Sequence, residues 1–449
     1  MPDYDLIVIG AGMAGVSAAN KASAQGWRVA IADRLPYGGT CALRGCDPKK
    51  ILRRGAEIID AARLLRGKGI RDGGLTIDWQ ALMAHKRGFT DPVPANLEKS
   101  LARNGVDTLN EPVRFTGPHT VDVGGRALTA GHFLIVTGAR PRPLDFSGHE
   151  LMVDSTHFME LGDLPRRILF VGGGFISFEF AHIAARAGAR TTIVDRGARP
   201  LKKFDPDLVE LLVERGTEAG IEVHRKTQVD SIERTSSAYR VHLHEDAVPT
   251  TLEVDLVVHG AGRVPDLSDL DLDSGEIAHS ERGVGVAPHL QSTSNPIVYA
   301  AGDAADTSGM PLTPVAVFEG KVAVSNMLNG TTTIPDYSGV PTAVFTIPEL
   351  VRIGMSELEA QENGYDIDVR YNDTGDWYSN YRVGEHTAAT KILVDRATDR
   401  ILGAHLLGPE YAELANTLAV AIRLGLTRRQ LKSATATYPT VGSDLGSML

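Results

Sequence analysis

Two cysteines are the residues of this chain whose type and spacing point most directly to chemistry. Cys41 and Cys46 stand five positions apart in the segment GGTCALRGCDPKK at 38–50, and the 449-residue chain has no other cysteine. Two thiols at this spacing can close as a disulfide and open again by taking up two electrons. A secreted domain stapled by disulfides would need more cysteines than two.

The residues after Cys46 predict a helix that favours ionisation of this thiol. A helical pattern begins at Pro48, and Asp47 reads as its N-cap. Cys46 is then placed at a helix N-terminus, where the helix dipole and the amines of Lys49 and Lys50 favour a thiolate.

The elements around the cysteines include a dinucleotide-binding pattern near the start of the chain. An apolar strand at 5–9 runs into G-x-G-x-x-G at Gly10, Gly12 and Gly15, and an alanine-rich helix, a second strand and Asp33 follow. The glycines permit a tight turn, close approach of a pyrophosphate, and close packing of the helix on the strand. The acid can accept hydrogen bonds from ribose hydroxyls.

The same pattern returns 162 residues later. A strand at 168–171 leads to Gly172 and Gly174, Ser177 takes the third glycine position, and Asp195 matches the first acid. One such motif is weak, because turns and tight packing also use glycine, but two copies with strand, helix and acid in place favour two dinucleotide sites. We expect a tightly bound flavin dinucleotide at one and an exchanging nicotinamide dinucleotide at the other, which together form an electron relay.

Three interpretations of the cysteine pair compete. A zinc site needs four ligands and would have to recruit distant histidines or carboxylates, so we expect no metal site. Two unpaired core cysteines are the plain alternative. The position of both cysteines beside the first nucleotide motif favours a redox-active pair.

The choice of nicotinamide nucleotide rests on opposing charges in the second repeat. Asp195 is the acid associated with a free ribose 2′-hydroxyl and hence NADH. Arg196 and Lys202 are basic residues that can hold the 2′-phosphate of NADPH, although a solvated basic loop is the alternative. We favour NADPH, with NADH as the other candidate.

Composition limits the class of protein. The length suggests roughly three domains. The formal net charge is −10, from 46 basic and 56 acidic residues, which makes nucleic acid a poor partner. The N-terminus shows no signal peptide, and no uncharged apolar run is long enough for a membrane span, so we expect a cytoplasmic α/β protein with no membrane partner.

These motifs together resemble the flavoprotein pyridine nucleotide–disulfide oxidoreductases of the glutathione reductase, lipoamide dehydrogenase and mercuric reductase type. The resemblance covers essentially the whole length, and its most specific part is GGTC-x4-C-x-P-x-K, which begins at Gly38. It implies two Rossmann-like dinucleotide-binding domains and a C-terminal α+β dimerisation domain. The implied division is 1–143 and 267–336 for FAD, 144–266 for NAD(P), and 337–449 for dimerisation.

The resemblance also implies roles for individual residues. Cys41 would be the interchange thiol that meets substrate, and Cys46 the charge-transfer thiol against the flavin. Glu179 would pair with Lys49 or Lys50 near the reactive edge of the flavin. Phe175 falls where many members carry a Tyr that gates the nicotinamide pocket.

The remaining motif positions would contact the cofactors. The predicted flavin contacts are Gly10, Gly12, Ala14, Gly15, Asp33, Arg34, Gly39, Thr40, Thr137, Gly138, Asp303, Leu312 and Thr313. The predicted nicotinamide nucleotide contacts are Gly172, Gly174, Phe175, Ile176, Asp195, Arg196, Lys202, Gly262 and Arg263.

The chain departs from the family near its C-terminus. The disulfide reductases of the family end in His-Pro with a nearby Glu, whereas here Tyr438 precedes Pro439 and Ser443 stands at the Glu position. A tyrosine, with a pKa near 10, supplies no imidazolium at neutral pH, so we include Tyr438 among the catalytic candidates and a buried interface aromatic as its alternative. In the family the partner's C-terminus completes each active site, which implies a homodimer.

The expected acceptor is a low-molecular-weight disulfide, as in glutathione reductase. A quinone, a metal ion or another electrophile is the second candidate. A redox-responsive flavin-binding protein without turnover is the alternative of a different class.

Overall fold

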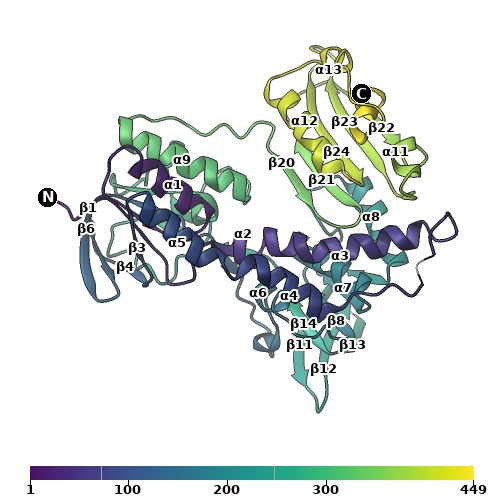
Figure 1. Cartoon of the computed structure of the whole chain (residues 1–449), viewed down its shortest axis with the longest axis horizontal. Helices are drawn as coiled ribbons and strands as arrows, with labels where there is room; N and C mark the ends of the chain where they lie inside the picture. Colours follow the sequence, from purple (N-terminus) through teal and green to yellow (C-terminus); the bar gives the residue numbers. More distant parts are fainter. Residues whose placement is uncertain (72, 247) are drawn as a thin grey trace. The chain divides into compact units, whose positions relative to one another are not determined.

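The repeat in the sequence is present in three dimensions as two parallel sheets, each in its own part of the chain. The computed structural model describes residues 1–71, 73–246 and 248–449 (Figure 1). The chain divides into two units. The first unit comprises Met1–Lys49, Ala84–Arg142 and Arg263–Tyr337, and the second comprises Lys50–Met83, Pro143–Gly262 and Ser338–Leu449.

The first unit is built on a sheet of order β3-β2-β1-β6-β5-β4, with β18 also paired to β6. Strands β1, β2, β3, β6 and β18 pair in parallel, whereas β4, β5 and β6 form an antiparallel meander. The strands of this sheet are β1 (Tyr4–Ile9), β2 (Val29–Ala32), β3 (Val106–Leu109), β4 (Val113–Gly117), β5 (Thr120–Val123), β6 (Arg126–Ile135) and β18 (Val298–Ala300).

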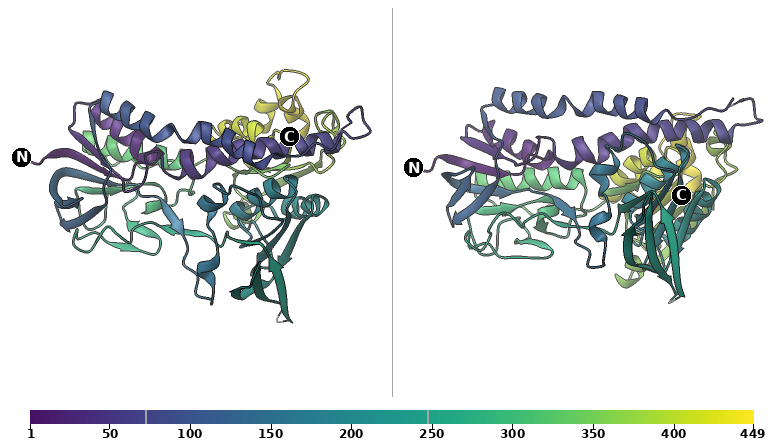
Figure 2. Two further views of the ribbon diagram at one scale, coloured as in Figure 1. Left: turned by 60° about the horizontal axis from the view of Figure 1, so that its bottom comes forward. Right: turned by 90° about the horizontal axis from the view of Figure 1, so that it is seen from below.

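Both faces of this sheet are buried, as the nearly unbroken apolar strands require. Leu6 and Val8 of β1 face the core that helices α1 and α9 cover, whereas Ile7 and Ile9 face the opposite core. Helices α1 and α9 run side by side in Figures 1 and 2. The helices and short strands of this unit are α1 (Met13–Ser23), α2 (Gly39–Arg44), α5 (Val93–Arg103), α9 (Thr313–Asn329), β7 (Ala139–Pro141), β15 (Arg263–Pro265), β16 (His279–Ser280), β17 (Gly283–Gly285), β19 (Ala305–Asp306) and the 3₁₀ turn η2 (Gly302–Ala304).

The second unit contains a parallel sheet of order β10-β9-β8-β14 and an antiparallel sheet of order β11-β12-β13. Figure 2 shows the antiparallel sheet in teal as a long twisted ribbon. The elements are β8 (Arg167–Val171), α7 (Phe175–Arg186), β9 (Arg190–Asp195), α8 (Pro206–Glu218), β10 (Ile221–Arg225), β11 (Thr227–Arg234), β12 (Tyr239–Glu245), β13 (Val248–Val254), β14 (Leu256–His259), α6 (Ser155–Phe158) and η1 (His149–Leu151).

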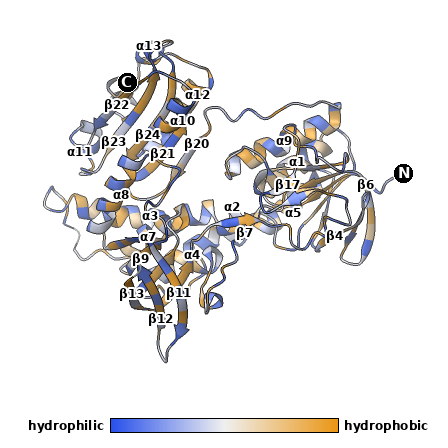
Figure 3. Ribbon diagram, turned by 180° about the vertical axis from the view of Figure 1, so that it is seen from behind, coloured by the Kyte–Doolittle hydropathy of each residue, from blue (hydrophilic) through white to orange (hydrophobic). Residues whose placement is uncertain are grey.

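The C-terminal part of the second unit is a five-stranded antiparallel sheet of order β20-β21-β24-β23-β22. Much of this sheet is orange in Figure 3, in line with its buried strands β23 and β24. Its elements are β20 (Pro341–Val344), β21 (Glu349–Gly354), β22 (Ile367–Asp373), β23 (Ala389–Asp395), β24 (Ile401–Gly408), α10 (Glu357–Glu362), α11 (Tyr378–Tyr381), α12 (Tyr411–Arg423), α13 (Arg428–Lys432), η3 (Val441–Asp444) and α14 (Leu445–Met448). The predicted α/β class with a C-terminal α+β part is confirmed.

Two helices cross the boundary between the units in sequence. Helix α3 (Cys46–Leu64) has its first turn in the first unit, and α4 (Trp79–Thr90) passes from the second unit to the first at Met83. The predicted N-cap of α3 at Asp47 is wrong. The amide of Lys49 donates to the carbonyl of Gly45 at 3.1 Å, so helical bonding begins with Gly45 and places Cys46 inside the first turn.

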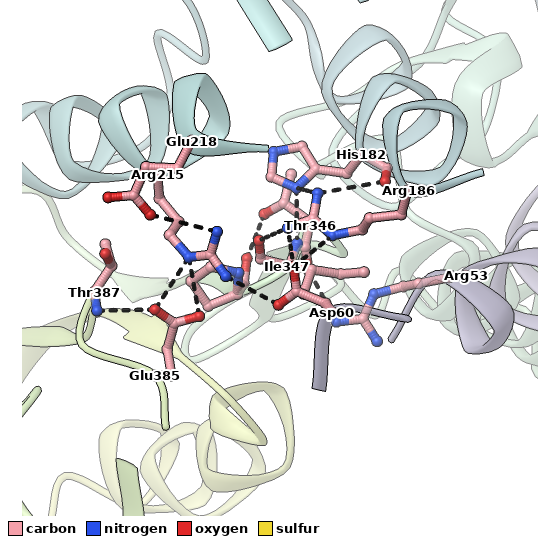
Figure 4. Close-up of polar contacts among 11 residues, drawn as sticks. Arg53, Asp60, His182, Arg186, Arg215, Glu218, Thr346, Ile347, Glu385 and Thr387 are labelled. Carbon is pink, nitrogen blue, oxygen red and sulfur yellow. Dashed lines mark hydrogen bonds and ion pairs between the residues drawn. The ribbon is translucent and has the colours of Figure 1, made fainter. Parts of the chain in front are cut away.

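A buried charge network holds the second unit together. Asp60 of α3 accepts hydrogen bonds from Arg186 of α7 and Arg215 of α8, and Arg215 also pairs with Glu385 (Figure 4). The His182 ring accepts a hydrogen bond at Nδ1 from the amide of Ile347 at 3.1 Å. Helices α3, α7 and α8 are therefore fixed to one another and to the start of the C-terminal sheet by groups that lack water as an alternative partner.

Candidate functional site

The first glycine turn has the geometry that a dinucleotide pyrophosphate needs. Gly10 has φ +114°, and its amide donates to the carbonyl of Ala32 at 2.8 Å, which carries the chain from β1 to α1. A Cβ on Gly39 would lie 2.6 Å from the Cα of Gly12, so the two backbones approach as closely as they can. Helix α1 begins at Met13, and the amides of its first turn are directed to the space beside these glycines.

The side chains next to this turn also fit a dinucleotide. The carboxylate of Asp33 accepts from the amides of Ala11 at 2.7 Å and Leu35 at 2.8 Å, which fixes it at the end of β2 with acceptor capacity left for ribose hydroxyls. The buried hydroxyl of Thr137 has no hydrogen-bond partner among the described residues. A bound group with polar atoms would satisfy it, so this observation fits the FAD that the sequence implies.

The two cysteines lie together in the first unit, at the junction of α2 and α3. Cys41 is half-buried in α2, Cys46 is exposed in the first turn of α3, and both are free thiols. The Cys46 sulfur lies 3.8 Å from the hydroxyl of Thr313, the first residue of α9. A hydrogen bond with Cys46, together with burial, raises the pKa of the Cys41 thiol.

Asp303 occupies the same unit, in the turn η2 at the end of β18. Burial raises the pKa of its carboxyl, and Arg263 opposes that shift. The guanidinium of Arg263 also donates to the carbonyl of Ala139 across the β7–β15 pair. Arg34, a predicted flavin contact, is ion-paired at the surface with Asp266 and Asp269.

The second glycine turn repeats the first in detail. Gly172 has φ +108°, and its amide donates to the carbonyl of Val194 at 2.8 Å. Gly174 precedes α7 with extended backbone, as Gly12 does before α1. Ser177 at the third position is fully buried, and its hydroxyl fills the space that a Cβ on Gly260 would need.

The acid of the second site is tightly packed. A Cβ on Gly173 would meet a carboxylate oxygen of Asp195 at 2.5 Å, and one on Gly197 would meet the Lys202 amine at 3.1 Å and the Asp195 oxygen at 3.4 Å. The Lys202 amine and the Asp195 carboxylate therefore border the same glycine. Arg196 is exposed in the same loop, so a phosphate would meet two cations and one anion here.

Helix α7 carries two further predicted residues. Phe175 is its first residue, with half of its surface exposed. Glu179 is buried and accepts from the amide of Phe345 at 2.8 Å. The amine of Lys50 lies 4.0 Å above the Phe345 ring and 3.9 Å from Glu349, so Lys50 and Glu179 both face the segment 345–349.

Other predicted positions are divided between the two units. Lys49 is buried in the first turn of α3, and Tyr438 is 80% exposed in the second unit. The remaining predicted residues of the first unit lie in or next to α1, α2, β6 and α9, namely Ala14, Gly15, Thr40, Gly138 and Leu312. In the second unit, Ile176 lies in α7 and Gly262 follows β14.

Sequence reasoning missed two features of these sites. The segment 345–349 (FTIPE) leads from β20 into β21 and contacts Glu179 and Lys50, but its sequence matches no motif that indicates a functional site. Glu319 is fully buried in α9 beneath the Asp303 turn. An acid in the otherwise apolar stretch after Thr313 was the available signal.

Two further observations concern the described residues only. Within 1–71, 73–246 and 248–449, no helix is both long and apolar enough to span a bilayer. In the same ranges, His, Cys, Asp and Glu side chains nowhere gather in a group of three or more suited to a metal ion.

Comparison with known proteins finds matches along nearly the whole chain. The family described as pyridine nucleotide-disulphide oxidoreductase matches residues 4–320, and its dimerisation domain matches 340–448. A glutathione reductase of Burkholderia cepacia is 31% identical over 442 residues, which cover 98% of this chain and 97% of the relative. A mercuric reductase of Staphylococcus aureus is 29% identical, with 99% and 81% covered.

A solved structure has the same fold. It is the Cu(II) complex of a cysteine-to-serine variant of the HOCl-induced flavoprotein disulfide reductase RclA from Escherichia coli. The TM-score is 0.90 at 26% identity, and the match covers 100% of this chain and 99% of the other.

Proposed function

This chain belongs to the pyridine nucleotide-disulphide oxidoreductases, an FAD-dependent family that uses NAD(P)H, and we propose that it reduces a low-molecular-weight disulfide through Cys41 and Cys46. The observation that carries the proposal is the pair of thiols itself. Both lie in the first unit, hydrogen-bonded to each other and adjacent to Thr313. The glycine turn of Gly10 belongs to that unit as well.

We propose that the two cofactors divide between the units. FAD would be held by the Gly10 turn, Asp33, Thr137 and Asp303, and NAD(P)H by the Gly172 turn and the loop after β9. When bound, FAD would accept a hydride from the reduced nicotinamide and supply two electrons to the cysteine disulfide. In sequence, the assignment is 1–143 and 267–336 for FAD, 144–266 for NAD(P) and 337–449 for dimerisation.

The chain's own residues then carry the exchange. Two electrons and two protons open the Cys41–Cys46 disulfide to two thiols. The Cys41 thiolate attacks a substrate disulfide RSSR, forms a mixed disulfide and releases one RS⁻. The Cys46 thiolate then attacks the Cys41 sulfur, releases the second RS⁻ and restores the disulfide. The sum is NAD(P)H + H⁺ + RSSR to NAD(P)⁺ and two RSH.

The proposed order of roles makes Cys46 the thiol next to the flavin and Cys41 the thiol that meets the substrate. Cys46 is exposed and Cys41 is half-buried, and a flavin stacked on Cys46 would cover its exposed surface. The raised pKa of Cys41 disfavours its thiolate, so this role requires a group that takes up the Cys41 proton before the attack. Residues 432–440 are exposed throughout, and Tyr438 among them would reach the active site of a partner subunit in a homodimer.

A metal ion is the second candidate acceptor. Mercuric reductases are among the relatives, and the RclA structure is a Cu(II) complex. Tyr438 also favours an acceptor other than a disulfide, because a phenol does not stabilise a thiolate at neutral pH as an imidazolium does. A disulfide remains the first candidate acceptor, because the sequence Arg-Gly-Cys-Asp-Pro-Lys-Lys at 44–50 is similar to the corresponding sequence of glutathione reductases.

Steady-state oxidation of NADPH and NADH with a panel of acceptors tests the proposal. The panel contains glutathione disulfide, other small disulfides, a quinone, Cu(II) and Hg(II). Turnover with a disulfide that is lost in both Cys41→Ala and Cys46→Ala supports the proposal. Turnover with a metal ion or quinone alone would replace it with the second candidate. A single reductive half-reaction without turnover would indicate the redox-responsive binding protein.

A further inference from the structure

Glu319 is a buried carboxylate that accepts a hydrogen bond from the backbone directly before Asp303, the predicted flavin acid, and others from the side chains of Thr307 and Tyr337. It lies in α9 with no exposed surface. One of its oxygens accepts from the amide of Gly302 at 2.6 Å, and the other accepts from the hydroxyls of Thr307 at 2.9 Å and Tyr337 at 2.6 Å. A buried carboxylate requires such donors, so these three groups and Glu319 hold one another in place.

The donor at Gly302 belongs to a turn that has little freedom. Gly302 has φ +65°, which favours glycine, and a Cβ there would lie 2.8 Å from the Cβ of Ala316. Ala316 and Glu319 stand three residues apart on the same face of α9. The turn is therefore fixed to α9 by one steric contact and by one charge-assisted hydrogen bond.

Asp303 follows Gly302 directly and depends on this turn. The backbone places its half-buried carboxyl, whose pKa burial raises while Arg263 opposes the shift. A carboxyl in this environment gains from moving toward water, so the backbone has to keep it in place. Glu319 makes the hydrogen bond to the backbone immediately before Asp303.

We propose that Glu319 is a positioning residue for the flavin site. It orders the Gly302–Asp303 turn before FAD binds, so the free energy of binding is not reduced by the cost of ordering the turn. Glu319 acts through the backbone that places Asp303, by its hydrogen bond to the amide of Gly302. The inference rests on the proposed flavin contact of Asp303.

The same helix offers a matched control. Asn326 lies seven residues after Glu319 and is equally buried. It donates to the carbonyls of His289 and Thr333 and accepts from Thr331 and Thr333, with no bond to Gly302. Loss of either side chain should destabilise the packing of α9, but only Glu319 acts on the Asp303 turn.

The experiment measures FAD binding to the full-length apoprotein by flavin fluorescence, together with thermal unfolding of the same apoproteins. In Glu319→Gln, an amide group replaces one acceptor oxygen and leaves at least one donor unsatisfied. We expect the Kd for FAD to rise about tenfold or more. Asn326→Leu should lower the melting temperature about as much as Glu319→Gln does, but it should change the Kd for FAD less than about threefold.

The outcomes separate the positioning role from general stability. The proposal would be overturned if the Kd for FAD of Glu319→Gln lay within twofold of that of the unmutated protein. It would also be overturned if Asn326→Leu lost as much affinity for FAD as Glu319→Gln. If Glu319→Gln does not fold, the double variant Thr307→Val with Tyr337→Phe removes both donors to one oxygen. It should weaken FAD binding severalfold, and an unchanged Kd would overturn the proposal. Failure of the unmutated apoprotein to bind FAD would instead refute the proposed function itself.

Discussion

Replacing Asp60 with alanine should be among the most destabilising single changes in the second unit. Both oxygens of Asp60 are used, one by Arg186 at 2.8 Å and 2.9 Å and the other by Arg215 at 3.0 Å (Figure 4). The side chain of Arg186 has no exposed surface, and that of Arg215 is 7% exposed. Removing the shared carboxylate therefore leaves guanidinium charge buried without its counterion.

The magnitude follows from that burial. Removal of one member of a buried ion pair costs about 3–5 kcal/mol, because the remaining charge is not resolvated. Arg215 retains Glu385 at 3.2 Å, so most of the cost falls on Arg186. At about 2–4 °C per kcal/mol for a unit of this size, the melting temperature should fall by about 6–20 °C. Urea denaturation of the holoprotein, followed by tryptophan fluorescence, measures the free energy directly.

Two variants make the result specific. Glu210→Gln breaks an exposed ion pair with Arg225 in the same unit and should cost at most about 1 kcal/mol. The double variant Asp60→Leu with Arg186→Met removes the unpaired charge together with its partner and should recover more than half of the loss. A cost below about 1 kcal/mol for Asp60→Ala would show that water or another anion reaches Arg186, and the argument from burial would fail.

Three further predictions concern the nicotinamide loop, Tyr438 and His182. Alanine at Arg196 and Lys202 should lower kcat/KM for NADPH about tenfold or more and leave NADH use nearly intact; an unmutated enzyme that prefers NADH in flavin reduction would contradict this. Tyr438→His should raise disulfide reduction at pH 7, because an imidazolium can stabilise the attacking thiolate, without changing flavin reduction by NAD(P)H; an unchanged pH–rate profile would refute the role. Burial, helped by the charges of Arg186, Arg215 and Arg53, lowers the pKa of His182, so folding stability should fall as pH drops below about 6.5, by about 1.4 kcal/mol per pH unit. His182→Asn should flatten that slope in denaturation experiments between pH 6.5 and 5, and identical slopes would exclude His182.

The fold was predictable where local sequence and geometry agree. The glycine turns at Gly10 and Gly172 were readable because positive φ and close backbone approach require glycine at those positions. The N-cap of α3 was not, because Asp47 followed by Pro48 is a good capping pattern and Gly45 supplies the first helical carbonyl instead.

The parts of the sites that could not be predicted depend on contacts between distant residues. Glu179 meets the amide of Phe345 166 positions away, and no local pattern specifies such a pair. Arg34 is predicted to contact the flavin, and its ion pairs with Asp266 and Asp269, more than 230 positions along the chain, could not be predicted from the sequence around Asp33. Charged residues on loops have many possible partners, and only the folded chain selects among them.

The most direct test of the central claim is an anaerobic titration of the purified protein with NADPH, monitored by its absorption spectrum. The protein should hold one FAD per chain, and addition of two electrons should produce a long-wavelength band from the Cys46 thiolate against the oxidised flavin. Cys46→Ser should abolish the band, whereas Cys41→Ser should show it without any reductant. Absence of the band in the unmutated protein, or the same behaviour in both variants, would contradict an electron path through these two thiols in this order.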